Sequence, residues 1–267
     1  MCWDKPDLKE LDQGFVKGKG GRKMFRFWVL TVILCLGMSW IGWGDAYREV
    51  GIEWINICSP CGNDNLGCRD DVAVRFYNVL RAHGYVGLFN FGNASAWESD
   101  FKEPHDQYYV DACDIVYHAD HGNHCRFAFG NTSHDDCRLW ASEARWGNQD
   151  LEWIVLDDCS CLPRHYGWTC WGDAFQGLHL ICSFDTGAHD SCSRGERFAN
   201  KLVAGWTVLQ AWFYACETTE GDGTYAAVMG AVKGSQDSYY DHIWGFGSVC
   251  SDPYPMNYWW WCNHNCD

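Results

Sequence analysis

Short apolar runs that alternate with helical patterns constrain the fold of this chain more than any other feature. Runs rich in β-branched and aromatic residues are typical of strands, and they lie at residues 50–58, 85–91, 114–118, 151–156, 178–184 and 224–232. Helical spacing of apolar residues predicts helices at 70–83, 193–204 and 208–217. Strands separated by helices favour a three-layer α/β/α sandwich, in which helices cover both faces of a mostly parallel sheet.

The beginning of the chain resembles an export signal. Residues 27–43 carry no charged side chain, and they have a basic flank before them and an acidic flank after them. This pattern predicts a cleaved signal peptide or an uncleaved signal-anchor in residues 1–44, and a single exported domain in residues 45–267. The protein is therefore expected outside the cell or at its surface. In the signal-anchor case, residues 27–43 tether it to a membrane.

The 17 cysteines agree with export, because reducing compartments rarely keep so many. They predict a disulfide-rich domain. Removing Cys2 and Cys35 with the leader leaves an odd number, so at least one thiol has no partner within the chain. The formal charge of −15 argues against nucleic acid as a partner, since phosphate binding needs a surplus of Lys and Arg.

Two of the apolar runs are followed by residues with catalytic chemistry. His121-Gly122 follows the run at 114–118, and Cys159 follows the run at 151–156. If the two strands are parallel neighbours, their tips lie about 4.8 Å apart in the pairing direction. The Cys159 thiolate could then attack a carbonyl while His121 supplies the proton for the leaving amine. Gly122 allows a close backbone approach, so its N–H could stabilise the oxyanion.

These motifs resemble those of the caspase-like, or caspase–haemoglobinase, superfamily of cysteine peptidases. The signature of that superfamily is an apolar strand ending in His-Gly and a later apolar strand ending in Asp-x-Cys, here residues 157–159. The resemblance covers residues 50–232. GLH at 177–179 and QAW at 210–212 are similar to patterns in exported archaeal and bacterial members.

The resemblance implies an exported cysteine endopeptidase that acts on a protein or peptide substrate. It makes Cys159 the nucleophile, His121 the general acid/base and Gly122 an oxyanion donor. It also implies that Asp157 lines the pocket for the residue before the scissile bond and selects Arg or Lys there. An acidic protein that prefers basic side chains is electrostatically consistent.

Other residues compete for some of these roles. His118 is a second imidazole, expected to be structural because it lies inside the strand and lacks a following Gly. Cys161 is a second thiol, expected to be half of a disulfide. Asp120 and Asp158 are expected to form a solvated rim, with a weak Ca²⁺ site as the alternative, and no other metal or cofactor is expected.

Two further segments leave alternatives open. Cys58-Ser59-Pro60-Cys61 predicts a structural disulfide, with a redox pair or a zinc site as alternatives. The aromatic tail at 258–266 is expected to pack over a sheet edge and be pinned by Cys262 or Cys266, with a sticky surface patch as the alternative. The excess of Cys and Trp also permits a different class of function: a catalytically silent, disulfide-rich surface or structural interaction protein on the same scaffold. The oligomeric state stays open.

Overall fold

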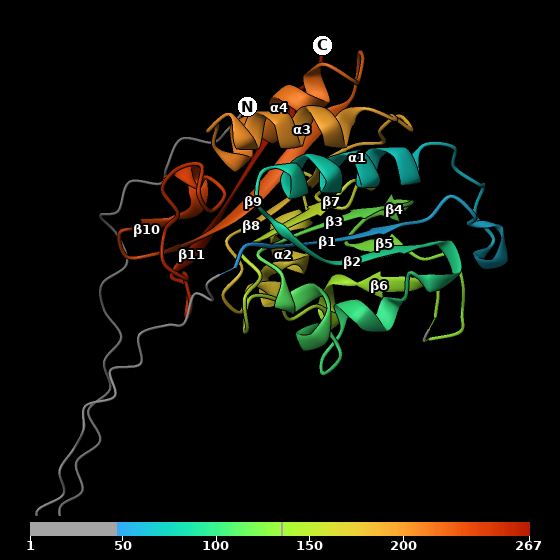
Figure 1. Cartoon of the computed structure of the whole chain (residues 1–267), viewed down its shortest axis with the longest axis horizontal. Helices are drawn as coiled ribbons and strands as arrows, with labels where there is room; N and C mark the ends of the chain where they lie inside the picture. Colours follow the sequence, from blue (N-terminus) through green and yellow to red (C-terminus); the bar gives the residue numbers. More distant parts are fainter. Residues whose placement is uncertain (1–46, 135) are drawn as a thin grey trace, which may run out of the picture. The chain divides into compact units, whose positions relative to one another are not determined.

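The expected strands form the main sheet of the computed structural model, which describes residues 47–134 and 136–267 (Figure 1). The strand order is β10-β9-β8-β7-β3-β1-β2, and β11 also pairs with β9. Strands β1, β2, β3, β7 and β8 are parallel, which confirms a large, mostly parallel sheet. The strands of this sheet are β1 Glu49–Trp54, β2 Val86–Gly92, β3 Ile115–Ala119, β7 Trp153–Leu156, β8 Leu180–Phe184, β9 Tyr225–Lys233, β10 Gln236–Asp237 and β11 Tyr258–Asn265.

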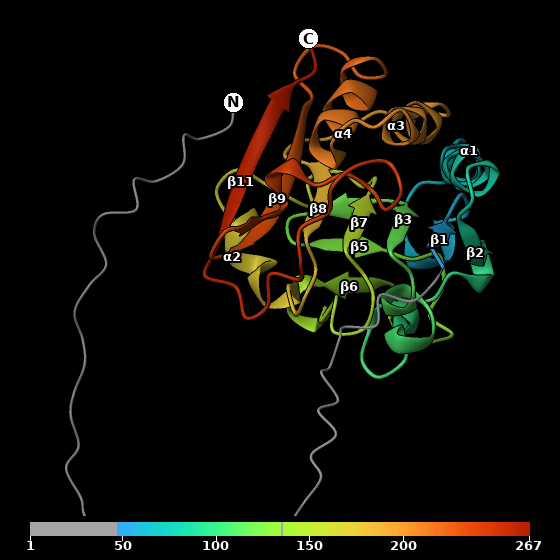
Figure 2. The same cartoon turned by 60° about the vertical axis from the view of Figure 1, so that its left-hand side comes forward.

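The first face of the sheet carries the three expected helices. They are α1 Arg69–Ala82, α3 Arg194–Val203 and α4 Val208–Glu217, and they lie together on one side of the strands (Figures 1 and 2). Alternate residues along each strand face them, for example Val50 and Ile52 of β1, and these residues share one apolar core with the helices. Helix α1 ends before Gly84, which has a φ of 96°.

The second face does not carry long helices, contrary to the expectation of helices on both faces. It is covered by the 3-10 turns η3 Glu98–Phe101, η4 Asp106–Tyr108 and η5 Val110–Ala112, the four-residue helix α2 Gly167–Cys170, and a small antiparallel sheet of β4 Gly122–Asn123, β5 Arg126–Ala128 and β6 Arg138–Trp140. Aromatic rings fill this second core: Phe101 packs against Phe127, Phe129 and Trp146. Large rings on short turns therefore bury this face without a continuous helical stripe.

The aromatic tail is an edge strand. β11 pairs antiparallel with β9 from Tyr258 to Asn265, so backbone hydrogen bonds hold the tail along its length. Trp259 and Trp261 pack against the second core, whereas Trp260 packs against the first. The expected packing at a sheet edge is confirmed, and the alternation of the strand explains why the three tryptophans divide between the two faces.

Disulfides join Cys61 to Cys137, Cys68 to Cys192, and Cys125 to Cys170. These pairs confirm a disulfide-bonded domain and are compatible with an extracellular protein. The Cys-x-x-Cys motif contributes a structural disulfide, as expected, through Cys61. The expected disulfide at Cys161 is wrong, because Cys161 is a buried thiol outside any disulfide. Because Cys58, Cys159, Cys161 and other described cysteines are all unbridged, the odd count does not identify one particular thiol.

The expected leader, with its membrane segment at 27–43, lies outside the described residues. Within residues 47–134 and 136–267, the structure contains no helix that is both long and apolar enough to cross a membrane.

Candidate active site

The pairing of β3 with β7 brings the two catalytic candidates to one edge of the sheet. The strands are parallel neighbours, as predicted, and His118 of β3 lies opposite Leu156 of β7. His121 and Cys159 each come three residues after this pair. Both residues therefore follow the carboxyl ends of adjacent strands, where the working groups of parallel sheets gather.

Gly122 brings the two strand ends into contact. A Cβ added at this position would lie 2.5 Å from the Cys159 carbonyl oxygen and 2.6 Å from the Cys161 sulfur. Neither neighbour is the end of a flexible side chain, so a larger residue would push the His121 segment away from the Cys159 segment. The His-Gly pair thus has a packing reason in this chain, besides the expected role of Gly122 as an oxyanion donor.

A backbone carbonyl orients the imidazole of His121. Its Nε2 lies 2.7 Å from the carbonyl oxygen of Asp64, and because a carbonyl oxygen only accepts, Nε2 carries the proton of this hydrogen bond. In a neutral imidazole, Nδ1 is then the proton acceptor. His121 is partly exposed, so it is held in one tautomer while remaining accessible.

The Cys159 thiol is partly exposed and is held from the other side of the site. The backbone N–H of Ala188 donates to its sulfur at 3.3 Å, and the Ala188 carbonyl oxygen lies 3.6 Å from the same atom. Burial raises the pKa of the Cys159 thiol, while the N–H of Ala188 acts in the opposite direction. No hydrogen bond joins Cys159 to His121 within the described chain. The raised pKa favours the protonated thiol, so nucleophilic attack by this sulfur would need a base.

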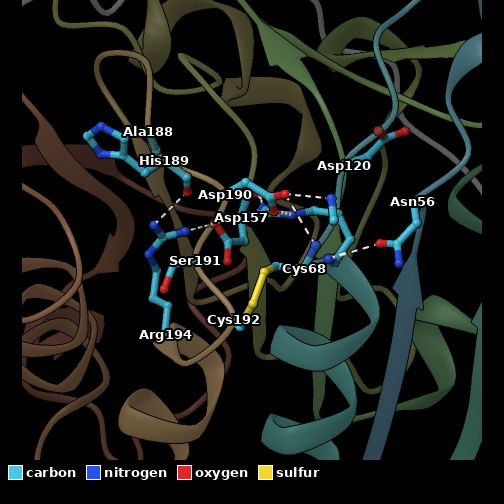
Figure 3. Close-up of polar contacts among 12 residues, drawn as sticks. Asn56, Cys68, Asp120, Asp157, Ala188, His189, Asp190, Ser191, Cys192 and Arg194 are labelled. Atoms are coloured by element: carbon cyan, nitrogen blue, oxygen red, sulfur yellow. Dashed lines mark hydrogen bonds and ion pairs between the residues drawn. A yellow bond between two sulfur atoms is a disulfide. The ribbon is translucent and has the colours of Figure 1, made fainter.

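The loop that carries Ala188 is anchored to the start of α1. The Asp190 carboxylate accepts hydrogen bonds from the backbone N–H groups of Gly67, at 2.6 Å, and Cys68, at 3.2 Å. The Cys68–Cys192 disulfide joins the same two segments (Figure 3). The group that donates to the Cys159 sulfur is consequently on a covalently fixed loop.

Asp157 lies in a buried ion-pair network (Figure 3). Its side chain is 1% exposed; Tyr117 donates a hydrogen bond to Oδ2 at 2.6 Å, and Arg194 forms an ion pair with Oδ1. Arg69 lies 3.5 Å from Oδ1 and also pairs with Asp190. Arg69 and Arg194 therefore pair with the Asp157 carboxylate, which is too buried to contact a basic side chain of a substrate.

The pocket beside His121 is lined by basic rather than acidic side chains. It has a volume of about 170 Å³, and its walls include His121, Gly122, Arg126 and Arg138. Neither arginine forms an ion pair among the described residues, although Arg126 stacks on Trp140 at 4.6 Å. Asp157 does not line this pocket. Its walls favour a negatively charged or polar group.

Cys58 lies close to the ring of His121. Ligand atoms of Cys58, Asp120 and His121 all lie within 4.8 Å of one another, which is compatible with a metal ion. Cys58 is nevertheless fully buried, and it donates to Asp120 at 3.1 Å. Burial and this carboxylate raise the pKa of the Cys58 thiol, while burial raises the pKa of Asp120 to about 6. Cys58 is therefore a poor nucleophile.

The other residues that the sequence offered for these roles are all buried. His118 is buried and its Nδ1 lies 2.9 Å from Asp158, in keeping with the expected structural role. Cys161 is fully buried and its sulfur contacts the Arg126 carbonyl oxygen at 3.1 Å, so it is no rival nucleophile. The expected solvated rim is wrong, because Asp120 and Asp158 are both buried.

Sequence patterns do not reveal the groups that contact the side chains of His121 and Cys159. Asp64 and Ala188 act through their backbone atoms, which every residue type except proline can supply in full, so no side-chain pattern marks them. Arg69 and Arg194 are ordinary helix residues in the sequence, far from Asp157 along the chain. Only the packing of α1 and α3 on the sheet brings them to this carboxylate.

The comparisons with known proteins yield one family. A family model described as a domain of unknown function, DUF6345, matches residues 52–264. The search of curated proteins finds no match. The matched range contains every residue of the candidate site described above.

Proposed function

The chain belongs to the DUF6345 family, and we propose that it is an exported cysteine endopeptidase in which Cys159 is the nucleophile and His121 the general base. The observation that carries the proposal is the orientation of His121 at the shared strand edge. Its Nε2–H is committed to the Asp64 carbonyl, which leaves Nδ1 to accept a proton. The caspase-like resemblance agrees with this placement, although the second face of the sheet lacks long helices.

The reaction proceeds by nucleophilic catalysis. Nδ1 of His121 takes the proton of the Cys159 thiol, and the sulfur attacks the peptide carbonyl carbon to form a new C–S bond. The C–N bond then breaks, and the imidazolium returns its proton to the leaving amine. Water, deprotonated by the same imidazole, hydrolyses the thioester and restores the thiol. Since the resting thiol has a raised pKa, this mechanism depends on His121 rather than on a preformed thiolate.

The backbone around Gly122 completes the site in this proposal. Its N–H is the candidate donor for the oxyanion of the tetrahedral intermediate, because the segment lies directly against Cys159. Removing one such donor typically costs a factor of about 10²–10³ in turnover. Only glycine fits the close contact with the Cys159 carbonyl oxygen, so a substitution at position 122 would also move the backbone.

The proposal departs from the resemblance in its specificity. Selection of Arg or Lys by Asp157 loses its support, because Arg69 and Arg194 compensate that buried carboxylate. Arg126 and Arg138 line the pocket beside His121, so we propose that an acidic side chain is preferred before the scissile bond. Charge-assisted bonds to a guanidinium suit a carboxylate in particular.

Matched peptide substrates test this function. Peptides that differ only in Asp, Glu, Lys or Arg before the scissile bond are offered to the wild type, to Cys159→Ala and to Arg138→Ala. We expect turnover in the wild type, none in Cys159→Ala, and loss of the acidic preference in Arg138→Ala, whose altered side chain is exposed. Equal turnover in the wild type and Cys159→Ala would refute the proposed cysteine peptidase activity. Faster cleavage after Lys or Arg would refute the acidic preference alone.

The second candidate is a catalytically silent interaction protein on the same scaffold. One observation favours it: an aromatic hollow of about 550 Å³ on α4, lined by Trp206, Phe213 and Tyr214. Its edge carries Lys201, which lies 4.1 Å from the centre of the Tyr214 ring. A protein without turnover on the peptide set, but with a partner lost in Trp206→Ala, would support this alternative.

A further inference from the structure

A second group of catalytic or metal-binding side chains lies at the opposite end of the parallel strands. His179 directly precedes β8, which runs parallel to β7, so it lies at the amino end of the strands whereas Cys159 lies beyond the carboxyl end. His179 is fully buried, Asp241 is 2% exposed, and Cys250 is partly exposed. The proposed peptidase mechanism uses none of these residues.

The three donor atoms converge on one point. Asp241 Oδ2 lies 2.6 Å from His179 Nδ1, and the Cys250 sulfur lies 3.7 Å from each of these atoms. Tetrahedral Zn²⁺, with bonds of about 2.0–2.1 Å to N and O and about 2.3 Å to S, places such donors roughly 3.3–3.6 Å apart. The distances from the Cys250 sulfur are thus already close to those of a zinc-bound thiolate. The N–O pair has to open by less than about 1 Å when a metal replaces the proton between them.

Neighbouring groups hold these donors in position. The backbone N–H of Cys250 donates to Asp241 Oδ1 at 2.9 Å, which turns Oδ2 toward the histidine. Asp252 Oδ1 lies 3.6 Å from His179 Nε2, the ring nitrogen that faces away from the other donors. A carboxylate behind a histidine ligand is the usual arrangement for fixing its tautomer at a metal site.

We propose that His179, Asp241 and Cys250 bind a divalent transition-metal ion, with Zn²⁺ as the ion that fits best, and that Asp252 orients the histidine. The combination of imidazole, thiolate and carboxylate selects a borderline-soft cation over Ca²⁺ or Mg²⁺. Two carboxylates and a thiol surround one buried imidazole, so a divalent cation balances their charge. Cys250 is partly exposed, which leaves an entry path and a fourth position for water.

The metal ties the segment after η8 (Ser238–Tyr240) to the start of β8. Asp241 also accepts the backbone N–H of Val208, the first residue of α4, at 2.8 Å through its own carbonyl oxygen. Binding therefore links the sheet, helix α4 and the 241–252 segment at one point. Such a link stabilises the folded state by the free energy of metal binding.

Cobalt titration of the metal-free full chain, with its three disulfides intact, tests the site, with Co²⁺ and Zn²⁺ as the probes. The wild type is expected to bind one Co²⁺ with a thiolate-to-cobalt absorption band, which Zn²⁺ then removes. Cys250→Ser is expected to lose the band. Asp252→Asn, whose side chain is 73% exposed, is expected to keep the fold and lose about 10–100-fold in affinity.

Cys58→Ser is the matched control, since it removes the thiol of the group formed with Asp120 and His121. It is expected to keep the band. No thiolate band in the wild type, an unchanged band in Cys250→Ser, or loss of the band in Cys58→Ser would overturn the site. Should Cys250→Ser fail to fold, an unchanged affinity in Asp252→Asn would overturn it. Because the readout is metal binding, it is independent of whether the chain cleaves peptides.

Discussion

The Nε2 atom of His121 donates a hydrogen bond to the carbonyl oxygen of Asp64 at 2.7 Å. The group that orients the candidate base is therefore a backbone atom rather than the carboxylate found in many catalytic triads. The side chain of Asp64 is dispensable in this arrangement, whereas the imidazole is not.

This relationship predicts opposite results for two substitutions. Asp64→Ala keeps the carbonyl oxygen and is expected to change kcat/KM by less than about threefold, within the range of surface substitutions. His121→Ala removes the base and is expected to lower kcat by about 10²–10⁴-fold. His124→Ala, an exposed neighbour, is the control. A large loss in Asp64→Ala would mean that its carboxylate takes part.

Gly122→Ala tests the contact between the two strand ends. The added Cβ would meet the Cys159 carbonyl oxygen at 2.5 Å, so the backbone has to shift and the dyad is pulled apart. We expect a loss of about 1–3 kcal/mol in the free energy of unfolding and turnover below detection. Denaturant titration and peptide hydrolysis measure the two effects.

Gly187→Ala is the control for this substitution, because no atom lies within 4 Å of the corresponding Cβ position. Turnover at the wild-type rate in Gly122→Ala would contradict the proposed pairing of His121 with Cys159.

Asp157→Asn distinguishes a structural carboxylate from a specificity pocket. Tyr117 and Arg194 are fully buried and lose their charged hydrogen-bond partner in this variant, while Arg194 keeps its ion pair with Glu220. The substitution is therefore expected to cost about 1–3 kcal/mol of unfolding free energy. The exposed pair of Asp71 with Arg75 provides the comparison, and Asp71→Asn is expected to cost less than about 0.5 kcal/mol. A stable Asp157→Asn protein with altered specificity would instead support a role of Asp157 in selecting the residue before the scissile bond.

The buried carboxyl group of Asp106 predicts a pH dependence of stability. Burial raises its pKa from 3.8 to about 6, so the folded chain holds this proton more tightly than the unfolded chain does. The stability it contributes is complete below about pH 4 and is lost as the pH rises to about 6. Asp106→Asn stays neutral and is expected to be about 1–3 kcal/mol more stable than the wild type above pH 7, with no difference below pH 4.

Unfolding titrations at several pH values measure this difference, with Asp71→Asn as the exposed control. A constant difference across the pH range would contradict the raised pKa.

The sheet and its helices could be predicted from the sequence because they depend on local patterns. β3 and β7 are buried on both faces, so their sequences read as continuous apolar runs. The general rule for parallel sheets then placed His121 and Cys159 at one edge. Strands of two or three residues, such as β4 and β5, are too short to give a pattern.

Partners that are distant in the sequence could not be predicted in the same way. Cys61 pairs with a cysteine 76 residues away, across loops whose course depends on the second core. The environment of Asp157 depends on Arg194 from a different helix, and the Asp-x-Cys motif carries no information about that contact. The group of His179, Asp241 and Cys250 likewise forms only in the folded chain.

Covalent capture of Cys159 tests the central claim most directly. The wild type is incubated with a short peptide that carries an electrophile in place of the scissile bond, and the modified residue is located by mass spectrometry. The account predicts one adduct on Cys159 that forms far faster than with iodoacetamide, and whose formation is lost in His121→Ala. An adduct on Cys58 or Cys250 instead, or labelling of Cys159 at the same rate in His121→Ala, would contradict the dyad.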